Sequence, residues 1–91
     1  EAAVEFRRLS GDTARLQQRI ERLHAGVLSP ARQRSVVALA AYRSNQTPLA
    51  GYFEARNAEV DAHRKLLTLE RELARTRARL ALKPFANGVE R

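Results

Sequence analysis

Apolar residues recur along the first half of the chain at alternating intervals of three and four positions. This spacing places them along one side of an α-helix and is typical of a contact with a second helix. The good helix formers Ala, Leu, Arg, Glu and Gln dominate the sequence, and no alternating strand pattern is present. The pattern therefore predicts an all-α protein. The series, with one polar member, comprises Phe6, Leu9, Thr13, Leu16, Ile20, Leu23 and Val27.

The second half repeats this pattern and adds a narrower stripe beside it. Two adjoining stripes indicate a helix that contacts a neighbour on each side, as in a sheet or ring of helices. We expect Leu66, Leu69, Leu73 and Leu80 to carry the packing between the helices. The main series comprises Ala62, Leu66, Leu69, Leu73, Thr76 and Leu80, and the second stripe comprises Val60, Leu67, Ala74 and Ala81.

A short polar segment separates the two halves. Asn tolerates the left-handed conformation that closes a helix, so Asn45 is expected just after the end of the first helix. Thr47 is expected to cap the next helix, with Pro48 at its first position. The sequence therefore predicts a long antiparallel coiled-coil hairpin over 1–83, with a first helix over 1–44, a turn near 44–47 and a second helix over 48–82.

Two further sites carry helix-breaking residues. Near 26–30, either Ser29 caps a fresh helix with Pro30 at its first position, or Pro30 kinks one continuous helix. We favour the kink, because the apolar pattern resumes at once with Val36 and Val37. At the other site, Pro84 and the Asn87-Gly88 pair predict an irregular C-terminal tail over 84–91.

The net charge of +7 makes nucleic acid, anionic lipid and acidic protein surfaces candidate partners. The basic residues are nearly all arginines spread through both halves and interleaved with Glu, which is typical of a solvated helix face. The densest run, Arg71 to Arg79, shares its segment with leucines and lacks aromatic residues for base stacking. We therefore expect no nucleic-acid partner. The absence of Met suggests a piece of a longer protein, and that of Cys excludes disulfides.

Catalysis has little support in this sequence. There is no Gly-rich phosphate loop, and no Ser stands in the setting of a nucleophile. Glu59 and His63 are four residues apart, a spacing that can present two metal ligands on one helix face. Two ligands do not make a metal site, and a solvated or cross-helix pair is the simpler interpretation. We expect neither an enzyme nor a cofactor nor a metal.

The residues around the turn are the candidate functional site. Tyr42 precedes the turn and Glu54 follows it, so a hydroxyl and a carboxylate can meet at the hairpin tip. If several hairpins converge, such groups make a polar constriction. The alternative is that Tyr42 and Phe53 pack the end of the hairpin.

The same turn resembles the C-terminal half of the TolC family of outer-membrane efflux ducts. The resemblance lies in Tyr42-Arg-Ser-Asn45, followed by Gly51-Tyr-Phe-Glu54-Ala55-Arg56 at the start of the second helix. Upstream, 27–33 (VLSPARQ) is similar to the family's LLPLA-Q stretch, and 69–80 is similar to its closing helix. Over residues 20 to 82 the combination is most similar to the CzcC-like branch of heavy-metal and cation efflux systems.

This resemblance implies a homotrimer with a barrel in the outer membrane, absent from this sequence, and helical hairpins in the periplasm. The hairpin tip would dock onto a periplasmic adaptor and open toward an inner-membrane RND pump. Tyr42 and Glu54 would form the closed entrance, where Glu54 would supply a ring of carboxylates that favours cations. The exposed tip of Ser44, Asn45, Gln46 and Thr47 would contact the adaptor.

The chain departs from the family pattern at three positions. Asn45 replaces the usual Gly, Gly51 stands where some members carry an acidic residue, and Thr47 stands where the prototype has Arg. One ring of entrance charge is therefore expected to be missing, and a gate lock built on that Arg is not assumed. Two alternatives compete with the duct. The first is the α-hairpin of the periplasmic adaptor, which usually continues into a strand-rich domain, and the second is a nucleic-acid-binding coiled coil, with salt-dependent DNA affinity.

Overall fold

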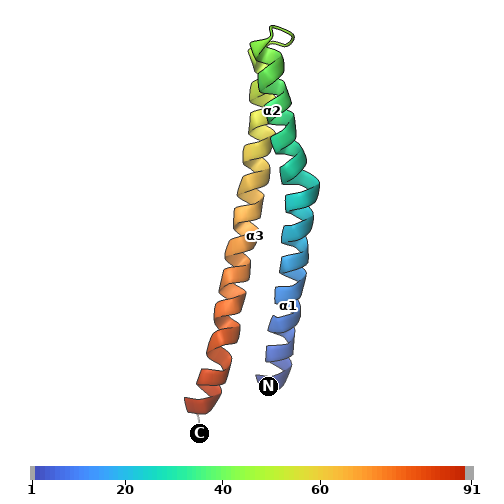
Figure 1. The fold of residues 1–91 in the computed structure, drawn as a ribbon. Helices are drawn as coiled ribbons and strands as arrows, with labels where there is room; N and C mark the ends of the chain where they lie inside the picture. The colour runs from blue at the N-terminus through green and yellow to red at the C-terminus, as the bar shows by residue number, and fades with distance from the viewer. Residues whose placement is uncertain (1, 90–91) are drawn as a thin grey trace. The chain divides into compact units, whose positions relative to one another are not determined.

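The structure is a computed structural model that describes the backbone of residues 2–89 and the side chains of residues 2–82. It is almost entirely helical, with no strand in this described part (Figure 1). The elements are α1 (Ala2–Leu23), a π-helical segment η1 (His24–Leu28), α2 (Ser29–Arg43) and α3 (Leu49–Val89). This confirms the predicted all-α class and the helix–turn–helix order.

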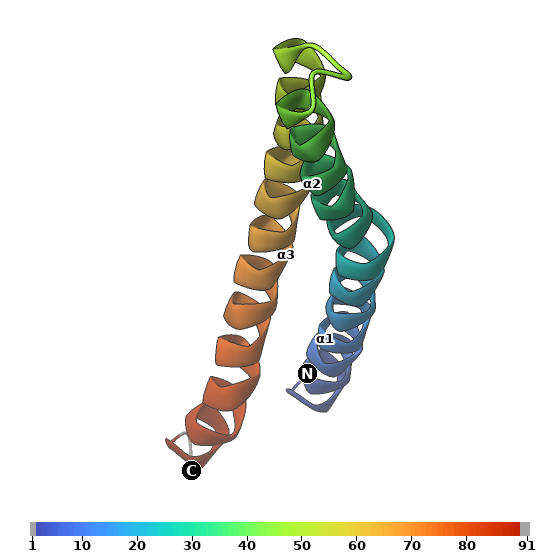
Figure 2. The ribbon, with the colours of Figure 1, turned by 45° about the horizontal axis from the view of Figure 1, so that its top comes forward.

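The chain divides into two compact units. Unit 1 combines Glu1–Ile20 with Thr68–Arg91, and unit 2 is the continuous stretch Glu21–Leu67. Unit 2 holds η1, α2, the turn and the first part of α3, and both views of the ribbon show α2 and α3 side by side (Figures 1 and 2). Unit 2 is therefore a helical hairpin.

The turn between α2 and α3 follows the Schellman pattern of hydrogen bonds. Asn45 has φ 59°, the left-handed conformation expected for it. The amide of Gln46 donates to the carbonyl of Ala41 at 2.8 Å, and that of Asn45 donates to Tyr42 at 3.0 Å. These bonds satisfy carbonyls at the end of α2, so the turn is specified by its own backbone. α3 begins at Leu49, one residue after the predicted start.

The junction of α1 and α2 is continuous through Pro30, as favoured from the sequence. Ser29 does not cap a fresh helix, because its own backbone is α-helical, at φ −61° and ψ −46°. Its amide donates to the carbonyl of His24, five residues back, which is the π-helical pattern. Pro30 has no N–H to donate, but the backbone is helical on both sides of it, so the helix continues through this position.

The π-helical segment shifts the buried side of the helix by one residue. The heptad pattern predicted Val27 in the helix contact, but Val27 is 47% exposed and Leu28 is 0% exposed. The interval from Leu23 to Leu28 is five residues, where a heptad requires four, and the wider π turn absorbs the extra one. The buried positions then continue with Ala31 and Ser35.

The main series on α3 is placed as predicted. Ala62 and Leu66 are buried in unit 2, and Leu69, Leu73 and Thr76 are buried in unit 1, while Leu80 is half-buried. The hydroxyl of Thr76 donates to the carbonyl of Glu72 at 2.9 Å, so this polar position is satisfied within its own helix.

The contribution of α1 to unit 1 is smaller than predicted. Leu9 and Leu16 are buried there, and Thr13 donates its hydroxyl to the carbonyl of Leu9 at 2.9 Å. Phe6, placed in the same series by its spacing, is 45% exposed.

The predicted end of the second helix is wrong. α3 continues to Val89, so 84–89 are helical and not an irregular tail, whereas 90 and 91 lie outside the described residues. A proline inside a helix removes one donor and bends the backbone, and here Pro84 does not end the helix.

Candidate functional site

The predicted tip is exposed. Ser44, Asn45, Gln46 and Thr47 are all exposed and non-helical, and the hydroxyl of Ser44 donates to the carbonyl of Ala40 at 2.6 Å. This bond holds the last turn of α2 together and leaves the other tip side chains facing solvent. The tip therefore offers a short polar surface on a backbone held by the Schellman turn.

The two candidate entrance residues are also exposed and are not brought into contact with each other. Tyr42 is 39% exposed at the end of α2, and Glu54 is exposed in the second turn of α3. Within the described side chains, neither forms a side-chain hydrogen bond or an ion pair. A site built on both residues would therefore need a further copy or a partner.

The aromatic residues after the turn do not close the end of the hairpin. Phe53 is 53% exposed, and its ring centroid lies 5.9 Å from that of Tyr52. The alternative in which Tyr42 and Phe53 pack the hairpin end is not favoured by these exposures. The rings of Tyr42 and Phe53 are instead exposed on the surface of unit 2.

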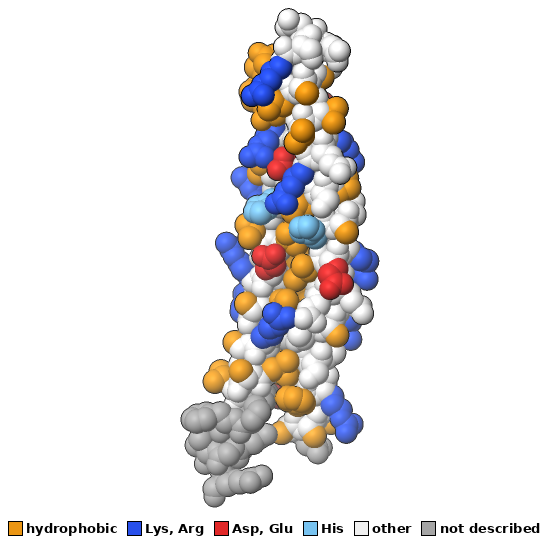
Figure 3. All heavy atoms as spheres, viewed as in Figure 1, with side chains coloured by type: hydrophobic (Ala, Val, Ile, Leu, Met, Phe, Trp, Pro, Cys, Tyr) orange, Lys and Arg blue, Asp and Glu red, His pale blue; other side chains and the backbone are white. Residues whose placement is uncertain are grey.

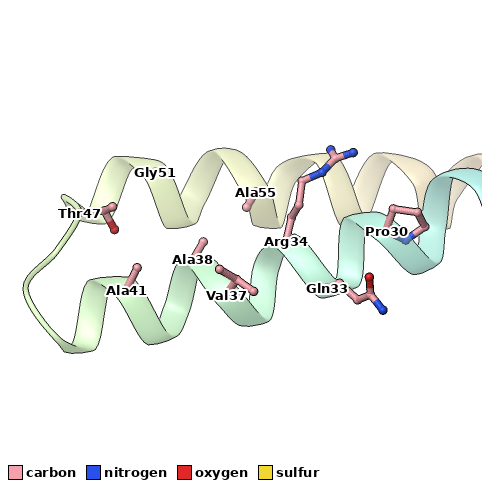
Figure 4. A pocket seen from close by; sticks show the side chains of 9 residues that line it. All are labelled: Pro30, Gln33, Arg34, Val37, Ala38, Ala41, Thr47, Gly51 and Ala55. Carbon is pink, nitrogen blue, oxygen red and sulfur yellow. The ribbon is translucent and has the colours of Figure 1, made fainter.

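A shallow groove runs between α2 and α3 next to the turn, and we call it the tip groove. Its volume is about 560 Å³, and small or apolar side chains form most of its wall (Figure 4). Ala38 and Ala55 line it from the two helices, and Gly51 adds no side chain at all. A hairpin with small residues on this side leaves room for an apolar side chain of another molecule. The full lining comprises Pro30, Gln33, Arg34, Val37, Ala38, Ala41, Thr47, Gly51 and Ala55.

A charged cluster that was not predicted as a site lies farther along the same two helices. Glu59 is 16% exposed; its carboxylate lies 2.9 Å from Arg56 Nη1 and 3.9 Å from Arg32 Nε across the hairpin. The sequence held a signal for this cluster, since Glu59 continues the main series of α3 three residues before Ala62. A carboxylate on the packed side of a helix needs a cationic partner.

The surroundings of Glu59 lower the pKa of its carboxyl below the ordinary value of 4.5. The Ser35 hydroxyl is the largest cause, followed by the Arg56 guanidinium. Ser35 Oγ is buried and makes no hydrogen bond of normal geometry, yet it lies near enough to stabilise the charged form. Glu59 is thus part of an ion-pair cluster, and the described side chains contain no group of three or more potential metal ligands.

This cluster predicts a specific pH dependence. Since the pKa of Glu59 is depressed in the folded chain, its contribution to stability is present above 4.5 and is lost as the pH falls through the folded value. Substituting Ser35 by Ala is expected to move the pKa of Glu59 up toward 4.5, because the largest stabilising contact is removed. The measurement is an NMR titration of the Glu59 carboxyl carbon, and an unchanged midpoint would contradict the proposed role of Ser35.

No described helix combines the length and apolar character needed to cross a membrane. Comparisons with protein-family models, with curated proteins and with solved structures yield no match.

Proposed function

We propose that this chain is a periplasmic coiled-coil hairpin of a trimeric, TolC-like efflux duct of the CzcC-like kind. The supporting observation is the turn at Asn45, whose left-handed backbone and Schellman bonds present an ordered, exposed polar tip. A hairpin tip of this kind has no chemistry of its own and requires no cofactor. Its role in the duct is docking and gating, and the energy for transport is supplied by the inner-membrane pump.

The tip groove is the proposed seat of the adaptor. Its apolar wall and the missing side chain at Gly51 suit a small apolar side chain at the end of another hairpin. Thr47 lines the groove, and the other polar residues of the tip precede it in the exposed turn, where hydrogen bonds can set the register of docking. In this proposal the groove supplies affinity and the turn supplies orientation.

The exposure of the second stripe on α3 supports the proposal that further helices pack against it in the working assembly. Within unit 2, Leu67 is 38% exposed and Val60 is half-buried, although both are apolar and seven residues apart. Val36 and Val37 on α2 are 69% and 67% exposed. Aliphatic side chains at such spacing are expected to pack against further helices of the duct.

Glu54 is proposed to form the cation-selective entrance together with Tyr42. In the full-length parent protein, Glu54→Gln is expected to reduce the cation preference of single channels, because a ring of three carboxylates becomes neutral. Glu70→Gln is the matched control, since Glu70 is another exposed carboxylate on α3 but lies in unit 1, away from the turn. Unchanged selectivity in Glu54→Gln channels would exclude the charge ring.

A further inference from the structure

A second groove of unit 2, which we call the arginine groove, has a different chemistry from the tip groove. Its volume is about 330 Å³ and both α2 and α3 contribute to its wall. Basic side chains dominate this wall, and Val60 is its one apolar member. The lining comprises Arg32, Arg56, Glu59, Val60, His63 and Arg64.

The charges of the arginine groove do not cancel. Three guanidinium groups and one carboxylate line the groove, so its lining carries a net formal charge of +2 when His63 is neutral. Basic side chains on the surface are interspersed with hydrophobic ones in the space-filling view (Figure 3). A concentration of positive charge in a concave site raises the local concentration of anions.

Glu59 positions two of these guanidinium groups without using up their donors. Its carboxylate contacts Arg56 Nη1 at 2.9 Å and Arg32 Nε at 3.9 Å, from opposite sides of the hairpin. A guanidinium carries five N–H donors, so these contacts occupy only part of the set. The arginine side chains remain 49% and 51% exposed, and an incoming anion can therefore reach them.

Unit 1 contains a groove of similar size but balanced charge, so a comparison of the two grooves distinguishes an effect of charge from an effect of shape. It has a volume of about 290 Å³ and is lined by Asp12, Arg15, Leu16, Arg19, Glu72 and Thr76. Its two arginines face two carboxylates, and Arg15 forms an ion pair with Asp12. The two grooves are similar in size, but this neutral groove has no excess charge for an anion.

We infer that the arginine groove binds a phosphate group through Arg32, Arg56 and Arg64, with Glu59 as a positioning residue. The planar guanidinium fork matches two phosphate oxygens at once, which a lysine ammonium does not. The phosphate belongs either to a lipid headgroup or to a soluble phosphorylated ligand. This site is separate from the proposed entrance, since it includes neither Tyr42 nor Glu54.

The test compares two double variants that remove the same charge from the two grooves. Arg32→Gln/Arg64→Gln alters the arginine groove, and Arg15→Gln/Arg19→Gln alters the neutral groove. Gln is a good helix former, so both variants are expected to fold, which circular dichroism checks. One arm titrates the full chain with inorganic pyrophosphate by calorimetry, and the other measures sedimentation with phosphatidylglycerol or phosphatidylcholine vesicles.

We expect the arginine-groove variant to lose about tenfold or more of its affinity for the phosphate ligand, and the neutral-groove variant to bind it like the unsubstituted chain. Binding of pyrophosphate would identify a soluble phosphate ligand, and binding of phosphatidylglycerol vesicles alone would identify a lipid headgroup. Equal losses in the two variants would overturn the site, because net charge alone would then explain the binding. Absence of binding in both arms would overturn it as well.

Discussion

Leu28→Ala is expected to lower the free energy of unfolding by about 2–5 kcal/mol. Leu28 is 0% exposed and is the largest fully buried side chain described. Removing its branched end loses apolar burial and leaves a cavity that the rigid helices cannot fill completely. Urea denaturation followed by far-ultraviolet circular dichroism measures the change. For a small domain this loss is a large fraction of the total stability.

Val27→Ala is the matched control for that result. Val27 precedes Leu28 in η1 but is 47% exposed, so its truncation is expected to change the stability by no more than about 0.5 kcal/mol. Together the two variants distinguish the register that buries Leu28 from the register that buries Val27. If Val27→Ala were the more damaging variant, the heptad pattern would continue unshifted and the π-helical segment would not set the packing.

Ala62→Leu is expected to destabilise unit 2 by about 1–3 kcal/mol. Ala62 is 3% exposed on α3, and the buried positions of α2 in the same unit, Ala31 and Ser35, are also small. Small residues at these positions let the helices approach closely, so a larger side chain has to push them apart. Thermal unfolding of the variant measures the cost, and a shift in NMR signals of the tip groove would report the separation of the helices.

Ala58→Leu controls for the added apolar volume. Ala58 lies one turn before Ala62 on the same helix but is exposed, so the same substitution there is expected to change the stability within about 0.5 kcal/mol. Equal effects of the two variants would show that close packing at Ala62 is not the cause.

Local signals in the sequence were sufficient where the chain contacts only itself. The left-handed Asn45 was predictable because few residues tolerate that conformation, and the Schellman bonds follow from it. The buried positions of α3 were predictable because an uninterrupted helix keeps one phase over its whole length. The breakers at Pro84 and Asn87-Gly88 were misleading, since α3 continues past them.

The candidate site was only partly predictable, because some of its contacts form between residues on different helices. Exposure of Tyr42, Glu54 and the tip follows from their place beside a turn. The approach of Arg32 to Glu59 joins residues far apart in the sequence, so it depends on the register of one helix against the other. That register is set by the pairing of α2 with α3, which spacing along a single helix does not reveal.

By itself, then, the sequence determined the helical class, the position of the turn and the apolar side of α3, because each depends on neighbours within a few residues. Only the tertiary structure decided that Leu28 replaces Val27 in the helix contact, and that Arg32, Arg56 and Glu59 meet in one groove. The physical reason for the groove is that α2 and α3 meet only across the hairpin. The burial of Leu28 depends on one inserted residue in the π turn, which rotates every later side chain about the helix axis. Its cost and its accommodation are settled by the facing helix, which local propensity does not see.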